Sequence, residues 1–142
     1  MADNLSIILN NRCFTFPVRV YYEDTDAGGV VYHARYLHFF ERARTEYLRT
    51  LNFSQQSLLQ EQQVAFVVKT MSIDYCIPAK LDDYLIVETE ITAVKGATIL
   101  FEQRLVRETV VLSKATVKVA CVDLGKMKPV AIPEELKAAF LK

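Results

Sequence analysis

The stretch from Tyr21 to Arg44, YYEDTDAGGVVYHARYLHFFERAR, concentrates the side chains that could do chemistry. It holds four acids, both histidines of the chain and two adjacent glycines. Asp24 and Asp26 lie just ahead of His33, where a helical spacing of apolar residues begins. A loop carboxylate can attack a carbonyl carbon or activate a water. Backbone N–H groups at a helix N-terminus can stabilise the oxyanion that forms. The stretch therefore fits acyl transfer without a metal.

The same residues also have an ordinary structural interpretation. Aspartate and glycine are common in turns, and aspartate often caps a helix. The spacing of Asp24 and Asp26, without further ligands, is weak evidence for a metal site. The three cysteines (Cys13, Cys76 and Cys121) form no CxxC motif, so we expect reduced thiols and neither zinc nor disulfides. We expect no metal and no cofactor.

Periodicity predicts the elements that must hold the loop. Residues 14–22 alternate as a half-buried strand does, and residues 33–51 carry a wide apolar stripe at helical spacing. Further alternating segments joined by short turns predict more antiparallel strands, at 70–77, 84–94, 97–107 and 115–122. We predict one domain over residues 1–142, with residues 1–12 as a loose tail. Its fold class is α+β: an antiparallel sheet of about five strands wrapped around one long central helix.

Composition narrows the class of partner. Seventeen basic and 17 acidic residues balance, so no strong field attracts nucleic acid or an anionic membrane. No apolar run approaches the roughly 20 residues of a membrane-spanning helix, and no secretory signal is visible at residues 1–10. We expect a cytoplasmic protein that binds small molecules or other proteins, and a net charge of zero does not oppose self-association.

The segment VRVYYEDTDAGGVVYHARYLHFFERARTEYLR resembles the signature of the 4-hydroxybenzoyl-CoA thioesterase-like hotdog family. It is most similar to the Tol-Pal-associated (YbgC-like) acyl-CoA thioesterase branch. The segments FSQQSLL, AFVVKTMSIDY, PAKLDD, ETEIT and CVDLGKMKP also resemble that branch. The similarity covers roughly residues 16–133.

The resemblance implies a fold, an assembly and a reaction. The fold would be a hotdog, and subunits would pair through a continuous sheet into a homodimer or homotetramer with active sites between subunits. The reaction would be hydrolysis of a short-chain acyl-CoA to free acid and CoA. Asp26 would be the nucleophile or general base. The backbone N–H of His33, seven positions further on, would polarise the thioester carbonyl.

The resemblance and the residues together suggest substrate contacts. Gly29 would let the backbone approach the substrate, and Tyr22 and Tyr32 could line the pocket or simply pack. Lys95 and Gly96 stand where family members often meet the nucleotide end of CoA, whose phosphates need cations or backbone donors.

Three interpretations stay open at this level. The His33 ring could orient substrate or lie in solvent. Glu41, on the same predicted helix, is interpreted as part of a structural ion pair with a nearby arginine. An acyl hydratase or dehydratase would use Asp26 and His33 for proton transfer instead. A non-catalytic module could dock on an acyl carrier protein or an envelope-associated partner.

Overall fold

The computed structural model describes residues 13–141 apart from 52–55, 57–59, 61 and 62. The tail predicted for residues 1–12 lies outside the described residues. The described residues form one long helix, one short terminal helix, a single turn of 3-10 helix and six strands. In chain order the elements are β1 (Phe14–Arg19), η1 (Tyr22–Asp24), α2 (His33–Thr50), β2 (Val64–Tyr75), β3 (Tyr84–Lys95), β4 (Thr98–Arg107), β5 (Val110–Asp123), β6 (Lys128–Pro129) and α4 (Glu134–Leu141).

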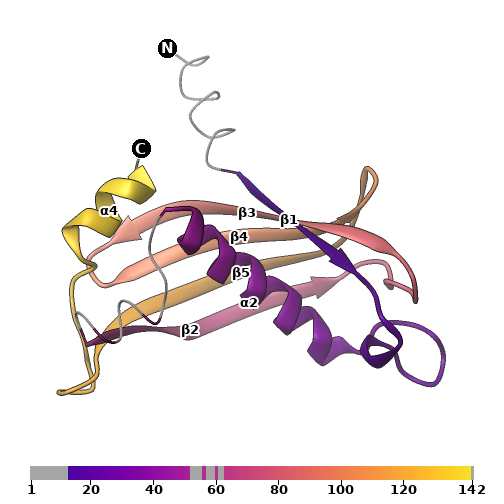
Figure 1. The fold of residues 1–142 in the computed structure, drawn as a ribbon, viewed down its shortest axis with the longest axis horizontal. Helices are drawn as coiled ribbons and strands as arrows, with labels where there is room; N and C mark the ends of the chain where they lie inside the picture. Colours follow the sequence, from indigo (N-terminus) through magenta and orange to yellow (C-terminus); the bar gives the residue numbers. More distant parts are fainter. Residues whose placement is uncertain (1–12, 52–55, 57–59, 61–62, 142) are drawn as a thin grey trace, which may run out of the picture.

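The strands form one antiparallel sheet in the order β1-β3-β4-β5-β2, with the two-residue β6 paired to β5. Figure 1 shows α2 lying across one face of this sheet. The N-terminal end of α2 and the end of β2 lie on the right of that view, whereas the β3–β4 turn and α4 lie on the left. The predicted α+β hotdog architecture is confirmed. In the described part of the chain, β2 to β5 each have ten or more residues, whereas β1 has six and β6 has two.

Helix α2 packs against the sheet through its apolar stripe. Phe39, Phe40 and Ala43 are at most 1% exposed. They pack with inward-facing side chains of β3, β4 and β5, such as Val87 and Leu105. Burying a large apolar side chain of this kind contributes about 1.5–3 kcal/mol. The packing fixes the helix, and with it the position of its first residue, relative to the sheet.

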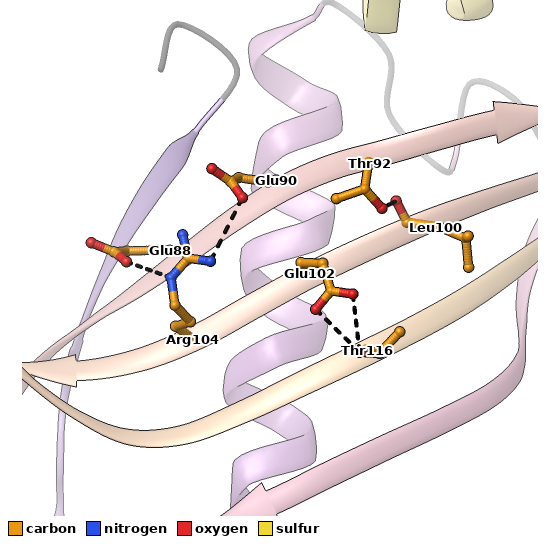
Figure 2. Close-up of polar contacts among 7 residues, drawn as sticks. All are labelled: Glu88, Glu90, Thr92, Leu100, Glu102, Arg104 and Thr116. Carbon is orange, nitrogen blue, oxygen red and sulfur yellow. Dashed lines mark hydrogen bonds and ion pairs between the residues drawn. The ribbon is translucent and has the colours of Figure 1, made fainter. Parts of the chain in front are cut away.

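The opposite face of the sheet is polar. Arg104 of β4 forms ion pairs with Glu88 and Glu90 of β3, and Glu102 accepts hydrogen bonds from the Thr116 hydroxyl. Figure 2 shows these contacts on the outer face of the three strands. The residues between them along β3 and β4, such as Thr89 and Gln103, are buried against α2. This alternation is expected of a sheet with one solvated face.

Three strands differ clearly from the prediction. The first strand does not reach Tyr22, because the chain turns into η1 and leaves that side chain 81% exposed. The strand predicted at 70–77 begins earlier, at Val64, and ends at Tyr75, so Ile77 lies in the loop that follows. The strand predicted at 115–122 begins earlier, at Val110, and ends at Asp123. The helix predicted over 33–51 is confirmed within one residue.

Candidate active site

The loop between β1 and α2 is held by its first aspartate. Asp24 is 5% exposed, and its carboxylate accepts hydrogen bonds from Arg35 at 2.9 Å and 2.7 Å. It also accepts the Tyr21 N–H at 2.9 Å, and its carbonyl accepts the Tyr32 N–H at 3.0 Å. A buried carboxylate needs such partners to offset its lost hydration. Asp24 therefore fixes both arms of the loop to the first turn of α2.

The loop between β2 and β3 holds the same segment from the other side. Ala79 is fully buried. Its N–H donates to the Tyr36 hydroxyl at 3.0 Å and its carbonyl accepts the Val31 N–H at 2.8 Å. The Leu81 N–H donates to the Gly29 carbonyl at 3.2 Å. These backbone bonds position residues 29–31 from a strand connection that is about 50 residues away in the sequence.

Asp26 lies at the exposed end of this loop. Its Oδ1 accepts the Gly28 N–H at 2.8 Å, its backbone N–H donates to Val30 at 2.9 Å, and its carbonyl accepts the Gly29 N–H at 3.1 Å. Gly29 has a φ of +80°, a conformation that side chains rarely adopt. No ion pair involving Asp26 occurs among the described residues. The turn thus holds the carboxylate while leaving most of its oxygen lone pairs free.

His33 is the first residue of α2, two residues beyond Val31. The preceding Tyr32 supplies no side-chain cap, and the His33 N–H has no acceptor within the part of the chain that the structure describes. A helix start without a cap presents free donors and a partial positive charge. The exposed His33 ring packs on Tyr75, with ring centroids 4.8 Å apart, rather than turning into the core.

A pocket of about 330 Å³ opens beside this helix start. Tyr36, one turn into α2, meets Tyr75 edge to face at 5.1 Å and is 2% exposed. Burial raises the pKa of the Tyr36 hydroxyl, although the hydrogen bond from Ala79 opposes this, so the phenol stays neutral. The lining residues are Val30, Val31, His33, Tyr36, Tyr75, Cys76, Ile77 and Pro78. Sequence reasoning missed Tyr36 and Tyr75 as parts of this site.

The structure brings some of the predicted site residues together and separates others. Asp26, Gly29, Tyr32 and His33 share one loop and helix start. Tyr22 is close along the chain but points into solvent at 81% exposure, and Tyr32 is 57% exposed.

Lys95 and Gly96 form the β3–β4 turn at the opposite end of the sheet from this site (Figure 1). The 12 residues of β3 span roughly 40 Å at the usual rise per residue. Within one chain, Lys95 therefore lies far from Asp26.

Comparison with known proteins identifies the family. A family model described as the thioesterase-like superfamily matches residues 20–140. The chain belongs to this thioesterase-like superfamily.

Two relatives narrow the branch. The acyl-CoA thioesterase YbgC of Haemophilus influenzae is 84% identical over 127 residues, covering 89% of this chain and 93% of its own. The acyl-CoA thioester hydrolase YbgC of Escherichia coli O157:H7 is 56% identical over 133 residues. The match covers 93% of this chain and 98% of the relative. The predicted YbgC-like branch is confirmed. The chain is a thioester hydrolase, and this decides against the hydratase alternative.

Solved structures agree on the fold. The probable thioesterase from Bartonella henselae superposes with a TM-score of 0.81 at 39% identity, over 85% of this chain and 99% of its own. The 1,4-dihydroxy-2-naphthoyl-CoA thioesterase from Synechocystis superposes with a TM-score of 0.85 at 26% identity. The match covers 90% of this chain and 95% of that structure. No described helix is long and apolar enough to cross a membrane.

Proposed function

We propose that this thioester hydrolase cleaves short-chain acyl-CoA to the free acid and CoA, using Asp26 and the N-terminal amide of α2. The observation that carries the proposal is the junction itself. The exposed carboxylate of Asp26 and the uncapped N–H of His33 are fixed to one rigid loop by Asp24 and Ala79. The names of the two YbgC relatives support the acyl-CoA substrate.

The chemistry follows from these two groups. The His33 N–H donates a hydrogen bond to the thioester oxygen and stabilises the negative charge that develops on it. Asp26 either attacks the carbonyl carbon, forming a mixed anhydride that water hydrolyses, or removes a proton from an attacking water. In both routes the C–S bond breaks and CoA leaves as the thiolate. In the general-base route water supplies the second oxygen of the product carboxylate. In the anhydride route an oxygen of Asp26 enters the product, and water that attacks the Asp26 carbonyl restores the side chain. Single turnover in H₂¹⁸O separates the routes, because only the anhydride route places ¹⁸O in Asp26.

The edge strands suggest how two subunits meet. β1 is a short edge of six residues that carries Pro17 and Arg19, features that discourage further pairing. β2, at the other edge, has 12 residues and no proline, with Val67 44% and Val68 48% exposed. We propose that β2 pairs antiparallel with the β2 of a second copy, which continues the sheet across a dimer. Light scattering at micromolar protomer concentration tests this: a dimer or tetramer mass supports it, and a monomer contradicts it.

The catalytic assignment is tested by thiol release from a panel of acyl-CoA substrates of increasing chain length. We expect Asp26→Asn to lose about 10²–10⁴-fold in turnover, the usual contribution of such a group. Asp123→Asn is the matched control, because Asp123 accepts the Gly125 N–H at 2.8 Å in the same type of turn. Wild-type turnover in Asp26→Asn would exclude Asp26 as the catalytic carboxylate, and an equal loss in Asp123→Asn would indicate a general structural effect.

A further inference from the structure

A second cavity lies under the middle of α2, away from the helix start. It has about 180 Å³ of free space, which is roughly six water volumes. Its walls are mostly apolar side chains from α2 and from the inner faces of β2, β4 and β5. The apolar lining residues are Leu48, Phe66, Val68, Ile99, Phe101 and Val119. Glu41, Arg44 and Thr45 are the polar ones.

Arg44 is the unusual member of this lining. It is 8% exposed, and its one hydrogen bond among the described residues runs from Nη1 to Gln103 Oε1 at 2.9 Å. The Gln103 amide nitrogen donates to the Phe40 carbonyl and to the Thr89 hydroxyl, both at 2.9 Å, so its oxygen is held toward Arg44. A guanidinium has five N–H donors. Most of the donors of Arg44 are therefore buried beside a cavity and have no acceptor in the part of the chain that the structure describes.

No carboxylate in the described chain neutralises Arg44. Glu41 lies one turn earlier on α2 and also borders the cavity, but it is exposed and not within ion-pair distance of Arg44. The ion pair predicted for Glu41 is therefore wrong among the described residues. Burial lowers the pKa of Arg44 while the nearby charge of Glu41 opposes this, and arginine remains charged at neutral pH. A buried, unpaired cation is costly unless something else binds it.

We propose that this cavity is a subsite for acyl groups that end in a carboxylate, which Arg44 binds through its free donors. The inference rests on the proposed acyl-CoA hydrolysis and adds the substrate class. Arginine and carboxylate match in geometry and form two parallel hydrogen bonds. The apolar walls cover the methylene groups between the thioester and the carboxylate, and the cavity holds a chain of only a few carbons. An unsubstituted acyl chain that reached this depth would leave the cation unpaired.

The position of the cavity indicates which active site it serves. Arg44 is 11 residues beyond His33, or about 16 Å along the helix axis, which is too far for a short acyl group held at the same helix start. In the proposed dimer the two β2 strands run antiparallel about their centres. Phe66 and Val68 then lie opposite the part of the second strand that leads to Tyr75, which packs on His33. The cavity of one subunit therefore faces the helix start of the other.

The test compares two substrates of equal length, glutaryl-CoA and pentanoyl-CoA, by thiol release with the enzyme-free rate subtracted. We expect the wild type to prefer glutaryl-CoA in kcat/KM by at least about tenfold, because a site built to pair a polar group discriminates against the analogue that lacks it. Arg44→Met should abolish or invert this ratio, and Arg44→Lys should keep part of it. Glu41→Gln should raise the ratio by removing a negative charge at the rim. Arg42→Met is the matched control, because Arg42 is exposed on the same helix and should leave the ratio unchanged.

The outcomes separate the two proposals. Hydrolysis of pentanoyl-CoA as fast as or faster than glutaryl-CoA by the wild type overturns the subsite and leaves acyl-CoA hydrolysis intact. A ratio that Arg44→Met does not change also overturns it. If Arg44→Met fails to fold, the wild-type ratio and its response to Glu41→Gln decide. Failure to hydrolyse any acyl-CoA in the panel overturns the proposed function, and the subsite with it.

Discussion

Replacing each of the two loop aspartates by alanine should affect a different property, stability for Asp24 and turnover for Asp26. The carboxylate of Asp24 accepts three charge-assisted or backbone hydrogen bonds and is 5% exposed. The carboxylate of Asp26 accepts one, from Gly28, and is exposed. From these contacts we expect Asp24 to contribute mainly to the stability of the protein. We propose that Asp26 contributes mainly to turnover.

The magnitudes follow from burial. Removing one partner of a buried ion pair costs about 3–5 kcal/mol. The Arg35 side chain is 26% exposed and can turn toward water, so we expect about 3 kcal/mol of lost stability for Asp24→Ala. Asp26→Ala loses a single exposed hydrogen bond, and its stability should stay within about 1 kcal/mol of the wild type. Its turnover should fall about 10²–10⁴-fold.

The assay pairs urea unfolding, followed by circular dichroism, with thiol release from one acyl-CoA. Protomer concentration is held fixed, because the stability of an oligomer depends on it. Turnover is measured at a low temperature where Asp24→Ala remains folded, and it should retain more activity there than Asp26→Ala. The reasoning is refuted if Asp26→Ala is the less stable variant. It is also refuted if Asp24→Ala matches the wild type in stability and loses turnover as completely as Asp26→Ala.

Three further predictions concern backbone conformation, the buried network and the thiols. Gly29→Ala has open space around the added methyl group, but its φ of +80° should cost about 1–2 kcal/mol in urea unfolding. Gln103→Leu should lower stability by about 3 kcal/mol in the same assay, because it leaves Arg44 and two other buried groups without their partner. Cys121 is buried, which also raises the pKa of its thiol, whereas Cys76 is exposed. A disulfide reagent near pH 8 should therefore modify Cys76 quickly and Cys121 only when the protein unfolds. Mass spectrometry of timed samples measures both reactions.

The long helix and the central strands were predictable because each obeys one period. Residues 33–50 repeat apolar side chains at helical spacing, since one face of α2 is buried along its whole length. β4 and β5 alternate because one face of the sheet is polar and the other meets α2. The loop acids and glycines were also visible as a group, and the structure keeps Asp26, Gly29 and His33 on one rigid junction.

The errors arose where distant residues decide the local structure. Alternation favoured a strand up to Tyr22, but Asp24 captures the Tyr21 N–H and Arg35, which turns the chain into η1. The ion pair predicted between Glu41 and a nearby arginine does not occur among the described residues, and Arg44, one turn away, bonds instead to Gln103, 59 residues further along the chain. Nothing in the local pattern indicates such a partner, or the packing of Tyr75 on the helix start.

The separation of Lys95 from Asp26 leads to a last prediction about assembly. The turn at Gly96 lies at the far end of the sheet from the Asp26 of its own subunit. If Lys95 contacts the phosphates of CoA in the proposed β2–β2 dimer, we therefore expect it to do so in the active site of the other subunit. Asp26→Asn should then lose turnover, and Lys95→Glu should raise KM with a smaller effect on kcat. Refolding the two variants together creates mixed dimers in which one site combines an intact Asp26 with an intact Lys95.

A statistical mixture should regain about a quarter of the wild-type activity at low substrate concentration, since half of the dimers are mixed and each has one intact site. The unmixed variants, refolded separately and then combined, are the control and should show only the residual activity of the two variants. The same activity in both samples would show that Lys95 does not act across the subunit interface, whereas recovery confined to the co-refolded sample requires an active site shared between two chains.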